Sequence, residues 1–381
     1  MSDLLRIRPA ATAAMMAVFS DEAAIGHALA FEAALARASA AEGLISGEAA
    51  EAIAALCASI TIDPAELAEE AALSGTLAIP LVQHLRAGLA GDAAKALHRG
   101  ATSQDVADTL LMRQAVAGIA LLLADSSRVC TALSGLAERH AVIPAIGRTL
   151  LQDALPVGFG LRLAQAAAGI DDAARRLDRE VATNAKVQLG GAAGTRVGLD
   201  GKGAAIAAHI ADALGLAPGE PWHARRGGVA AIASALGILI GALGKFARDI
   251  SLLAQNGVGE AREPAIAGRG GSSAMAHKRN PTGCQVALSA AARAPGLVAA
   301  ILGALPQEEE RGLGGWQAEG PVLADLFLLA SGAAAAMATV AEGLEIDEAA
   351  IARNLTAAGQ GSDIGESEAI IAALLNHPEK G

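Results

Sequence analysis

Aromatic residues are scarce in this sequence. They make up 2% of the 381 residues, and tyrosine is absent. Hydrophobic residues nevertheless reach 53%, mostly alanine, leucine, isoleucine and valine. Alanine has the highest helix propensity, and leucine ranks close behind it. Alternating runs of β-branched residues are few, which argues against extensive sheet. We therefore expect an all-α protein whose small side chains let its helices approach one another closely.

Basic clusters and paired metal ligands are also missing. The net charge is −11, and no Lys/Arg block is present, which argues against nucleic acid and anionic membranes as partners. The three cysteines, Cys57, Cys130 and Cys284, are scattered and odd in number. They fit buried thiols in a reducing cytoplasm better than a disulfide framework or a metal site. The short apolar piece Ala13–Phe19 is not a convincing signal peptide.

Long apolar runs are present but limited in length. The uncharged stretches Gly227–Gly244 and Leu326–Ala341 contain 18 and 16 residues. A membrane-spanning helix needs about 20. We therefore expect both stretches to form core helices that are buried all round, and we expect no membrane partner.

Apolar residues at helical spacing predict several long helices. The five longest are expected over Asp105–Arg139, Val157–Asn184, Gly228–Asn256, Thr282–Gly303 and Pro321–Gly343. Three polar, glycine-rich interruptions separate them: Leu97–Gln104, Gln188–Gly203 and Gly257–Pro281. This pattern indicates a bundle that keeps its chemistry at the ends of its helices.

The segment Gly271–Pro281 carries the strongest functional signal. Glycines give it a free backbone, Ser272 and Ser273 supply hydroxyl groups, and Lys278 supplies a cation. Asn280 is suited to cap the next helix, and proline suits its first turn. Such a loop beside a helix N-terminus can bind an anion. An ordinary linker before a capped helix explains these residues equally well.

The segment His98–Asp105 is the second candidate. Thr102 is followed three residues later by Asp105, which is a capping-box pattern ahead of an apolar run. Taken alone, the segment could be no more than the start of a helix.

Both segments resemble motifs of the fumarase/aspartase superfamily. The first resembles the signature G-S-S-x-M-P-x-K-x-N-P, with Ala276 in place of the usual proline, and the second resembles H-x-G-A-T-S-Q-D. The first resemblance implies that Ser272 transfers the proton and that Lys278 and Asn280 hold a substrate carboxylate. The second implies that a substrate carboxylate is bound by Thr102 and Ser103.

A third segment, Gly147–Gln152, departs from most of the superfamily. Fumarases, argininosuccinate lyases and adenylosuccinate lyases have T-H-x-Q here, whereas this chain has Leu150 in place of the histidine. An amine or hydroxide leaving group needs a proton in the transition state. A carboxylate, whose acid has a pKa of about 4, leaves without one. Leu150 therefore favours lactone opening and its reverse.

Three runs resemble the bacterial 3-carboxy-cis,cis-muconate cycloisomerase branch. Gly147–Pro156 resembles G-R-T-[WL]-L-Q-x-A-L-P, Gln188–Thr195 resembles Q-x-G-G-A-A-G-T, and Glu310–Glu319 resembles E-R-x-x-G-G-W-Q-x-E. The resemblance extends from about residue 15 to about residue 373. It is weaker at Thr76, where relatives have asparagine. Besides Thr102 and Ser103, the substrate-binding residues it implies are His98, Arg99, Arg148, Thr149, Gln152, Thr195, Ser273, Met275 and Arg311.

The resemblance also implies an architecture and a reaction. Three helical domains are expected, at residues 1–97, 98–335 and 336–381, in a homotetramer whose 20-helix core takes five helices from each subunit. Each active site would combine three subunits. The expected reaction converts 3-carboxy-cis,cis-muconate to 4-carboxymuconolactone in aromatic-acid (protocatechuate) catabolism, without metal or organic cofactor. The alternatives are a sulfomuconate substrate, an adenylosuccinate-type lyase and a catalytically silent helical protein.

Overall fold

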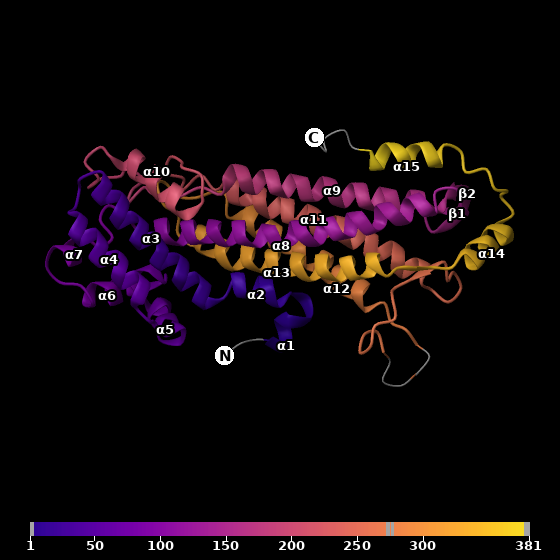
Figure 1. Ribbon diagram of the computed structural model, residues 1–381, viewed down its shortest axis with the longest axis horizontal. Coiled ribbons are helices and arrows are strands. Elements are labelled where there is room, and N and C mark those ends of the chain that lie inside the picture. The colour runs from indigo at the N-terminus through magenta and orange to yellow at the C-terminus, as the bar shows by residue number, and fades with distance from the viewer. Residues whose placement is uncertain (1–3, 272–274, 276–277, 377–381) are drawn as a thin grey trace.

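Five long helices form the centre of the molecule. The structure is a computed structural model that describes residues 4–271, 275 and 278–376. The five helices run side by side along the long axis (Figure 1). They are α8 (Ser103–Arg139), α9 (Phe159–Asn184), α11 (Gly227–Leu253), α12 (Thr282–Gly303) and α13 (Gly315–Glu342). Each corresponds to one of the long helices expected from the sequence, although α13 begins earlier than predicted and contains Pro321 within it.

The prediction of an all-α fold is confirmed. Within the described residues, the strands form only two short antiparallel pairs. One pair is a hairpin of β1 (Pro144–Thr149) and β2 (Gln152–Gly158), and the other joins β3 (Ala261–Arg262) to β4 (Glu345–Ile346). Both pairs lie at the bundle end where α8 finishes (Figure 1).

Shorter helices surround the bundle. At the end where α8 begins lie α3 (Asp21–Ala41), α4 (Gly47–Ser59), α5 (Pro64–Ser74), α6 (Ala78–Ala87), α7 (Gly91–Ala96) and α10 (Gly203–Leu214) (Figure 1). The N-terminal elements α1 (Leu4–Ile7), η1 (Arg8–Ala10) and α2 (Ala13–Val18) lie along the bundle. At the opposite end, α14 (Glu348–Ala358) packs against β1, and α15 (Ser367–Leu375) returns along α9.

Small residues let the bundle helices approach closely, as the composition predicted. A Cβ added at Gly160 of α9 would lie 2.1 Å from the carbonyl oxygen of Ala137 on α8. A Cβ at Gly244 of α11 would lie 2.7 Å from the Cβ of Ala291 on α12. Both distances are too short for a real carbon contact, so a larger residue would force the helices apart. Close-packed interiors tolerate such added volume poorly.

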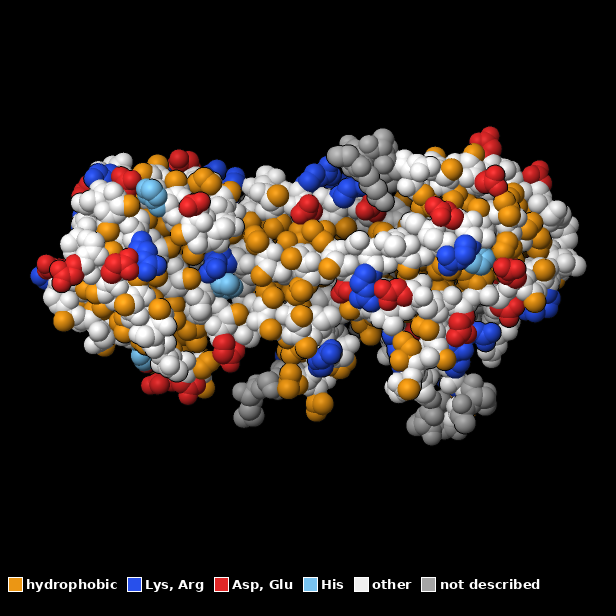
Figure 2. Space-filling view, in the orientation of Figure 1, with side chains coloured by type: hydrophobic (Ala, Val, Ile, Leu, Met, Phe, Trp, Pro, Cys, Tyr) orange, Lys and Arg blue, Asp and Glu red, His pale blue; other side chains and the backbone are white. Residues whose placement is uncertain are grey.

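The helices that contain the uncharged stretches are longer than the stretches themselves. Four of them, α8, α11, α12 and α13, are long and apolar enough to span a membrane by length and composition alone. Helix length, unlike the length of the uncharged stretches, therefore does not exclude a membrane partner. In α8, α11 and α13, more than half of the most apolar window is buried inside the chain, whereas in α12 only 22% is buried. Hydrophobic side chains accordingly reach the surface along the middle of the molecule (Figure 2).

Candidate active site

The predicted site residues fall into two clusters at opposite ends of the bundle. The amino-end cluster, around the N-terminus of α8, contains His98, Arg99, Thr102, Ser103 and Arg311, and Thr195 ends the 188–195 turn that Gly190 and Gly191 tie to Asp105. The hairpin-end cluster contains Arg148, Thr149 and Gln152 on the β1–β2 hairpin, and Met275, Lys278 and Asn280 in the segment before α12, which Arg279 joins to Glu345 of β4 at the same end of the bundle. Ser272 and Ser273 lie outside the described residues. Because α8 has 37 residues, its ends are about 55 Å apart. A single chain therefore does not bring the two clusters together.

Arg311 joins the amino-end cluster from a distant part of the chain. It lies between α12 and α13, and its Nη1 donates to Thr102 Oγ1 at 2.8 Å while its Nη2 lies 3.4 Å from Ser103 Oγ. No described carboxylate forms an ion pair with Arg311. The N–H groups of Ser103 and Gln104 also have no protein acceptor among the described residues. A positive charge and free helix N-terminal donors make this cluster suitable for an anion.

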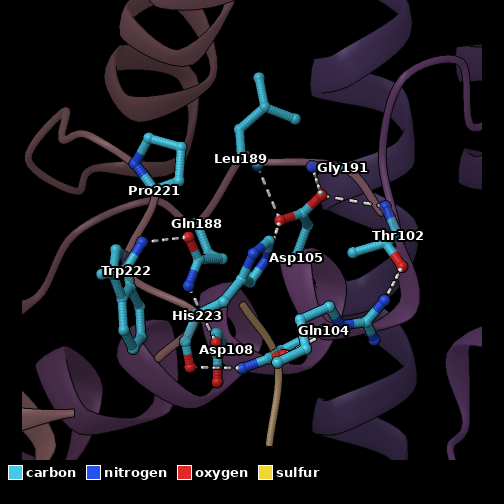
Figure 3. A network of polar contacts seen from close by, with 12 residues as sticks. Thr102, Gln104, Asp105, Asp108, Gln188, Leu189, Gly191, Pro221, Trp222 and His223 are labelled. Atoms are coloured by element: carbon cyan, nitrogen blue, oxygen red, sulfur yellow. Dashed lines mark hydrogen bonds and ion pairs between the residues drawn. The ribbon is translucent and has the colours of Figure 1, made fainter. Parts of the chain in front are cut away.

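Asp105 fixes the shape of the amino-end cluster (Figure 3). Its buried carboxylate accepts hydrogen bonds from the backbone N–H groups of Thr102 at 2.9 Å, Gly190 at 2.9 Å and Gly191 at 3.0 Å. His223 Nε2 lies 2.7 Å from the same carboxylate and donates to it, since an ionised carboxylate only accepts. The carboxylate half of the predicted capping box is thus present. Asp105 also ties the 188–195 turn to the start of α8.

A buried charge network lies beneath this cluster, and motif comparison missed it. Arg226 donates to both carboxylate oxygens of Asp108 at 2.8 Å, bonds Glu319 Oε1 at 3.1 Å and stacks 4.6 Å above the ring of Trp222. Burial raises the pKa of Glu319, and the Asp108 charge adds to this while Arg226 opposes it. The sequence offered two signals for it: the spacing of Asp105 and Asp108 by one helical turn, since such residues share a helix face, and the presence of Glu319 in the Glu310–Glu319 run.

Removing the cation from this network should destabilise the fold. Arg226→Met leaves two buried carboxylates without their common partner, and breaking a buried ion pair in this way costs about 3 kcal/mol. Denaturant unfolding near neutral pH at fixed protein concentration measures the loss, which should shrink at low pH as the carboxylates take up protons. Arg128→Met is the matched control. Arg128 also contacts two carboxylates, on Asp125 and Glu342, but at the surface, so its loss should cost less than about 1 kcal/mol. Equal losses in the two variants would contradict a role for burial.

Glu260 organises the hairpin-end cluster. Its side chain is fully buried and contacts Arg148 Nη2 at 2.6 Å, Arg162 Nη1 at 3.0 Å and Asn354 Nδ2 at 2.8 Å. Burial acts to raise the pKa of Glu260, but hydrogen bonds from Arg148 and Asn354 and the arginine charges outweigh it and lower the pKa. Arg148 is therefore engaged by a carboxylate of its own chain. Arg279 is similarly engaged by Glu345 at 2.9 Å.

Leu150 lies at the tip of the β-hairpin. Leu150 and Leu151 have φ values of 51° and 63°, and their side chains are 93% and 79% exposed. Two central residues with positive φ form the turn that joins antiparallel strands most directly, usually with asparagine or glycine. Leucines in this conformation are strained, and such strain is concentrated at functional sites. Thr149 and Gln152 pair directly across the base of this turn.

The expected capping by Asn280 is wrong. Helix α12 begins at Thr282 with Pro281 as its N-cap residue and no side-chain cap. The N–H groups of Gly283 and Cys284 instead donate to the carboxylate of Glu263 at 3.0 and 2.7 Å. This carboxylate occupies the helix N-terminus, which is therefore not free for a substrate anion. Asn280 donates its own N–H to the Gly270 carbonyl at 2.8 Å and its side-chain amide to Gly271.

Lys278 differs from the arginines around it. Arg148, Arg269 and Arg279 all have carboxylate partners. No described residue forms an ion pair with the exposed ammonium group of Lys278. Lys278 therefore provides a cation at this end of the bundle whose charge no carboxylate among the described residues balances. Among the described residues, no cluster of His, Cys, Asp or Glu could hold a metal ion.

Comparison with known proteins identifies the family. A family model described as lyase matches residues 8–296. The chain is 47% identical to the 3-carboxy-cis,cis-muconate cycloisomerase of Bradyrhizobium diazoefficiens, over 91% of this chain and 78% of that protein. It is also 47% identical to the enzyme of the same name from Pseudomonas aeruginosa, over 90% and 76%. The solved 3-carboxy-cis,cis-muconate lactonizing enzyme from Pseudomonas putida superimposes with a TM-score of 0.87 at 37% identity, covering 98% of this chain and 86% of that one. Together with the motifs around Thr102 and Lys278, these matches show that the chain belongs to the fumarase/aspartase superfamily of lyases.

Proposed function

We propose that the protein is a cycloisomerase that converts 3-carboxy-cis,cis-muconate to 4-carboxymuconolactone in the breakdown of aromatic acids. The observation that carries this proposal is Arg311, whose guanidinium binds Thr102 and Ser103 without a carboxylate partner among the described residues. Arg311 belongs to the segment that resembles the cycloisomerase branch. Its side chain contacts Thr102 and Ser103, which belong to the segment that resembles the carboxylate-binding motif of the whole superfamily. Similarity to enzymes named as cycloisomerases supports the same substrate.

The reaction moves one proton and forms one carbon–oxygen bond. A substrate carboxylate oxygen adds to a carbon of the conjugated double bond, and the displaced electron pair moves onto a second carboxylate as an enediolate. Lys278, Asn280 and the start of α8 are proposed to stabilise that charge, which develops mainly in the transition state. Ser272 then delivers a proton to carbon, and it removes this proton in the reverse direction. Water then returns a proton to the Ser272 oxygen, so that atoms and electrons balance without a metal or an organic cofactor.

We propose a homotetramer in which each active site combines several subunits. The two clusters lie about 55 Å apart along α8, and an antiparallel neighbouring copy would bring its hairpin end beside the amino end of this chain. The exposed leucines at the hairpin tip and the mostly uncovered apolar helix α12 support such packing. Large exposed apolar surfaces usually mark interfaces. The buried cysteines Cys57 and Cys284, which form no disulfide, support a cytoplasmic location for this assembly.

A spectrophotometric assay tests the proposed function. The purified protein should consume 3-carboxy-cis,cis-muconate, and the loss of the conjugated diene should be visible as a fall in ultraviolet absorbance. The sulfo-substituted muconate and adenylosuccinate are the comparison substrates. Faster turnover of the sulfo compound would change the assigned substrate. Turnover of adenylosuccinate alone would contradict lactonisation.

The Leu150→His variant tests the nature of the leaving group. If a carboxylate leaves during lactone opening, no acid is needed beside it, and we expect kcat/KM to stay equal or fall, because a polar ring replaces an apolar side chain. The measurement is kcat/KM for lactone opening from pH 5.5 to 8 in both proteins. A variant that is faster than wild type below about pH 6.5, where a histidine is mostly protonated, would contradict a carboxylate leaving group. Leu73→His, at another exposed leucine, controls for adding a surface histidine.

A further inference from the structure

Glu32 is a buried carboxylate with a single polar partner among the described residues. It lies on α3, its side chain is 0% exposed, and its Oε1 lies 2.6 Å from His98 Nδ1. Its second oxygen, Oε2, is buried and has no hydrogen-bond partner among the described residues. Burying a carboxylate is costly unless an opposite charge compensates it. Among the described residues, the His98 imidazole is the one ionisable group in direct contact with Glu32, so it is placed to compensate the carboxylate charge.

His98 occupies a constrained position at the amino-end cluster. Its φ of 61° lies in the left-handed region, which non-glycine residues rarely adopt. It precedes the N-cap residue Thr102 by four positions. The side chain remains 18% exposed. Because Nδ1 contacts Glu32, the accessible ring nitrogen is Nε2, which has no acceptor among the described residues.

We propose that Glu32 is a positioning residue that keeps His98 as an imidazolium, so that His98 Nε2–H binds a carboxylate of the substrate. This inference rests on the proposed function, in which the amino-end cluster holds a substrate carboxylate. With Glu32 bonded to Nδ1, the ring is held in one orientation, and its Nε2–H, which shares the delocalised positive charge, lies on the accessible side. His98 and Arg311 would then supply two cations to a substrate with three carboxylates.

The charged groups around His98 support this protonation state. Burial disfavours the charged ring, and Arg86 of α6 acts in the same direction. The charge and hydrogen bond of Glu32 on α3, with a contribution from Asp105 on α8, outweigh these effects and raise the pKa of His98 above its usual 6.5. The charged form therefore persists to higher pH in the folded protein. Its contribution to stability and to anion binding is present below pH 6.5 and is lost as the pH rises through the raised pKa.

Titration of His98 by nuclear magnetic resonance tests the first half of the proposal without substrate. The His98 ring signal, assigned by its loss in His98→Gln, should titrate above pH 6.5 in the wild type. In Glu32→Gln the midpoint should fall by at least about one pH unit, because the carboxylate charge is lost while burial remains. A wild-type midpoint at or below 6.5 would overturn the proposal even if Glu32→Gln does not fold.

The pH dependence of catalysis tests the second half. In Glu32→Gln the alkaline limb of kcat/KM should move to lower pH, and at pH 8 KM should rise about tenfold with a smaller change in kcat. Glu70→Gln is the matched control, because Glu70 forms a comparable 2.7 Å contact with His84 between α5 and α6, and neither of these two residues forms a hydrogen bond or ion pair with the amino-end cluster among the described residues. Its pH profile should match the wild type. An unmoved profile in Glu32→Gln with a shifted His98 titration would overturn the role in binding. If the His98 titration shifts in Glu32→Gln but the wild-type protein consumes no muconate, the proposed function is contradicted, whereas the effect of Glu32 on His98 is not.

Discussion

Ser272→Ala is expected to lower kcat by about 10³-fold while the fold and the assembly persist. Positioned proton transfer contributes about 10² to 10⁴ in rate, and alanine removes the hydroxyl that would carry the proton. The segment is rich in glycine, and its base is closed by the hydrogen bond from the Asn280 N–H to the Gly270 carbonyl at 2.8 Å. That bond does not involve Ser272, so we expect the unfolding midpoint to change little.

The measurement is kcat in both directions, with circular dichroism and size-exclusion chromatography to verify the fold. Ser127→Ala provides the control, since Ser127 is an exposed serine on α8 away from both clusters. It should retain the activity of the wild type. A kcat within about tenfold of wild type in Ser272→Ala would rule out Ser272 as the proton donor, because other groups would then supply the transfer.

The helices of the bundle could be predicted because the pattern that indicates each helix lies within one continuous segment of the sequence. Alanine-rich segments with helical spacing, such as Thr282–Gly303, gave the same bounds in sequence and structure. The capping-box pattern at Thr102 and Asp105 likewise depends on residues one turn apart. The grouping of Thr102, Ser103 and Thr195 could be anticipated only through resemblance, because their segments are far apart along the chain.

The partners of charged side chains could not be predicted. Arg148 belongs to a motif that implies substrate binding, yet it contacts Glu260, which is 112 residues away. Glu263 takes the N-terminus of α12, a role that the sequence assigned to Asn280. Such pairings depend on which helices and strands become neighbours, and residue spacing contains no information about that. The exposure of the Leu150 side chain could not be predicted for the same reason, because it depends on which elements pack around the hairpin.

Lys278 differs from the arginines of the hairpin-end cluster because no carboxylate among the described residues forms an ion pair with it. Arg148 and Arg279 are held by Glu260 and Glu345, so their loss would disturb the fold as well as binding. Lys278 has no ion-pair partner in the described part of the chain, and it belongs to the motif that implies carboxylate binding. A substrate carboxylate that becomes an enediolate would gain charge beside this ammonium group. Its contribution should therefore be larger in the transition state than in the ground state.

Lys278→Met should lower kcat/KM by about 10³-fold, with a rise in KM and a fall in kcat. Methionine retains much of the apolar side chain but removes the charge. Loss of one preorganised electrostatic group costs about 10² to 10³ in kcat, and weaker binding of the substrate adds to this. Lys245→Met is the control, because Lys245 is exposed on α11 and paired with Asp249; its kinetics should not change. If Lys278→Met lowers kcat but leaves KM unchanged, Lys278 acts only on the enediolate. If neither constant changes, Lys278 does not contact the substrate, and the carboxylate must be held by the amino-end cluster alone.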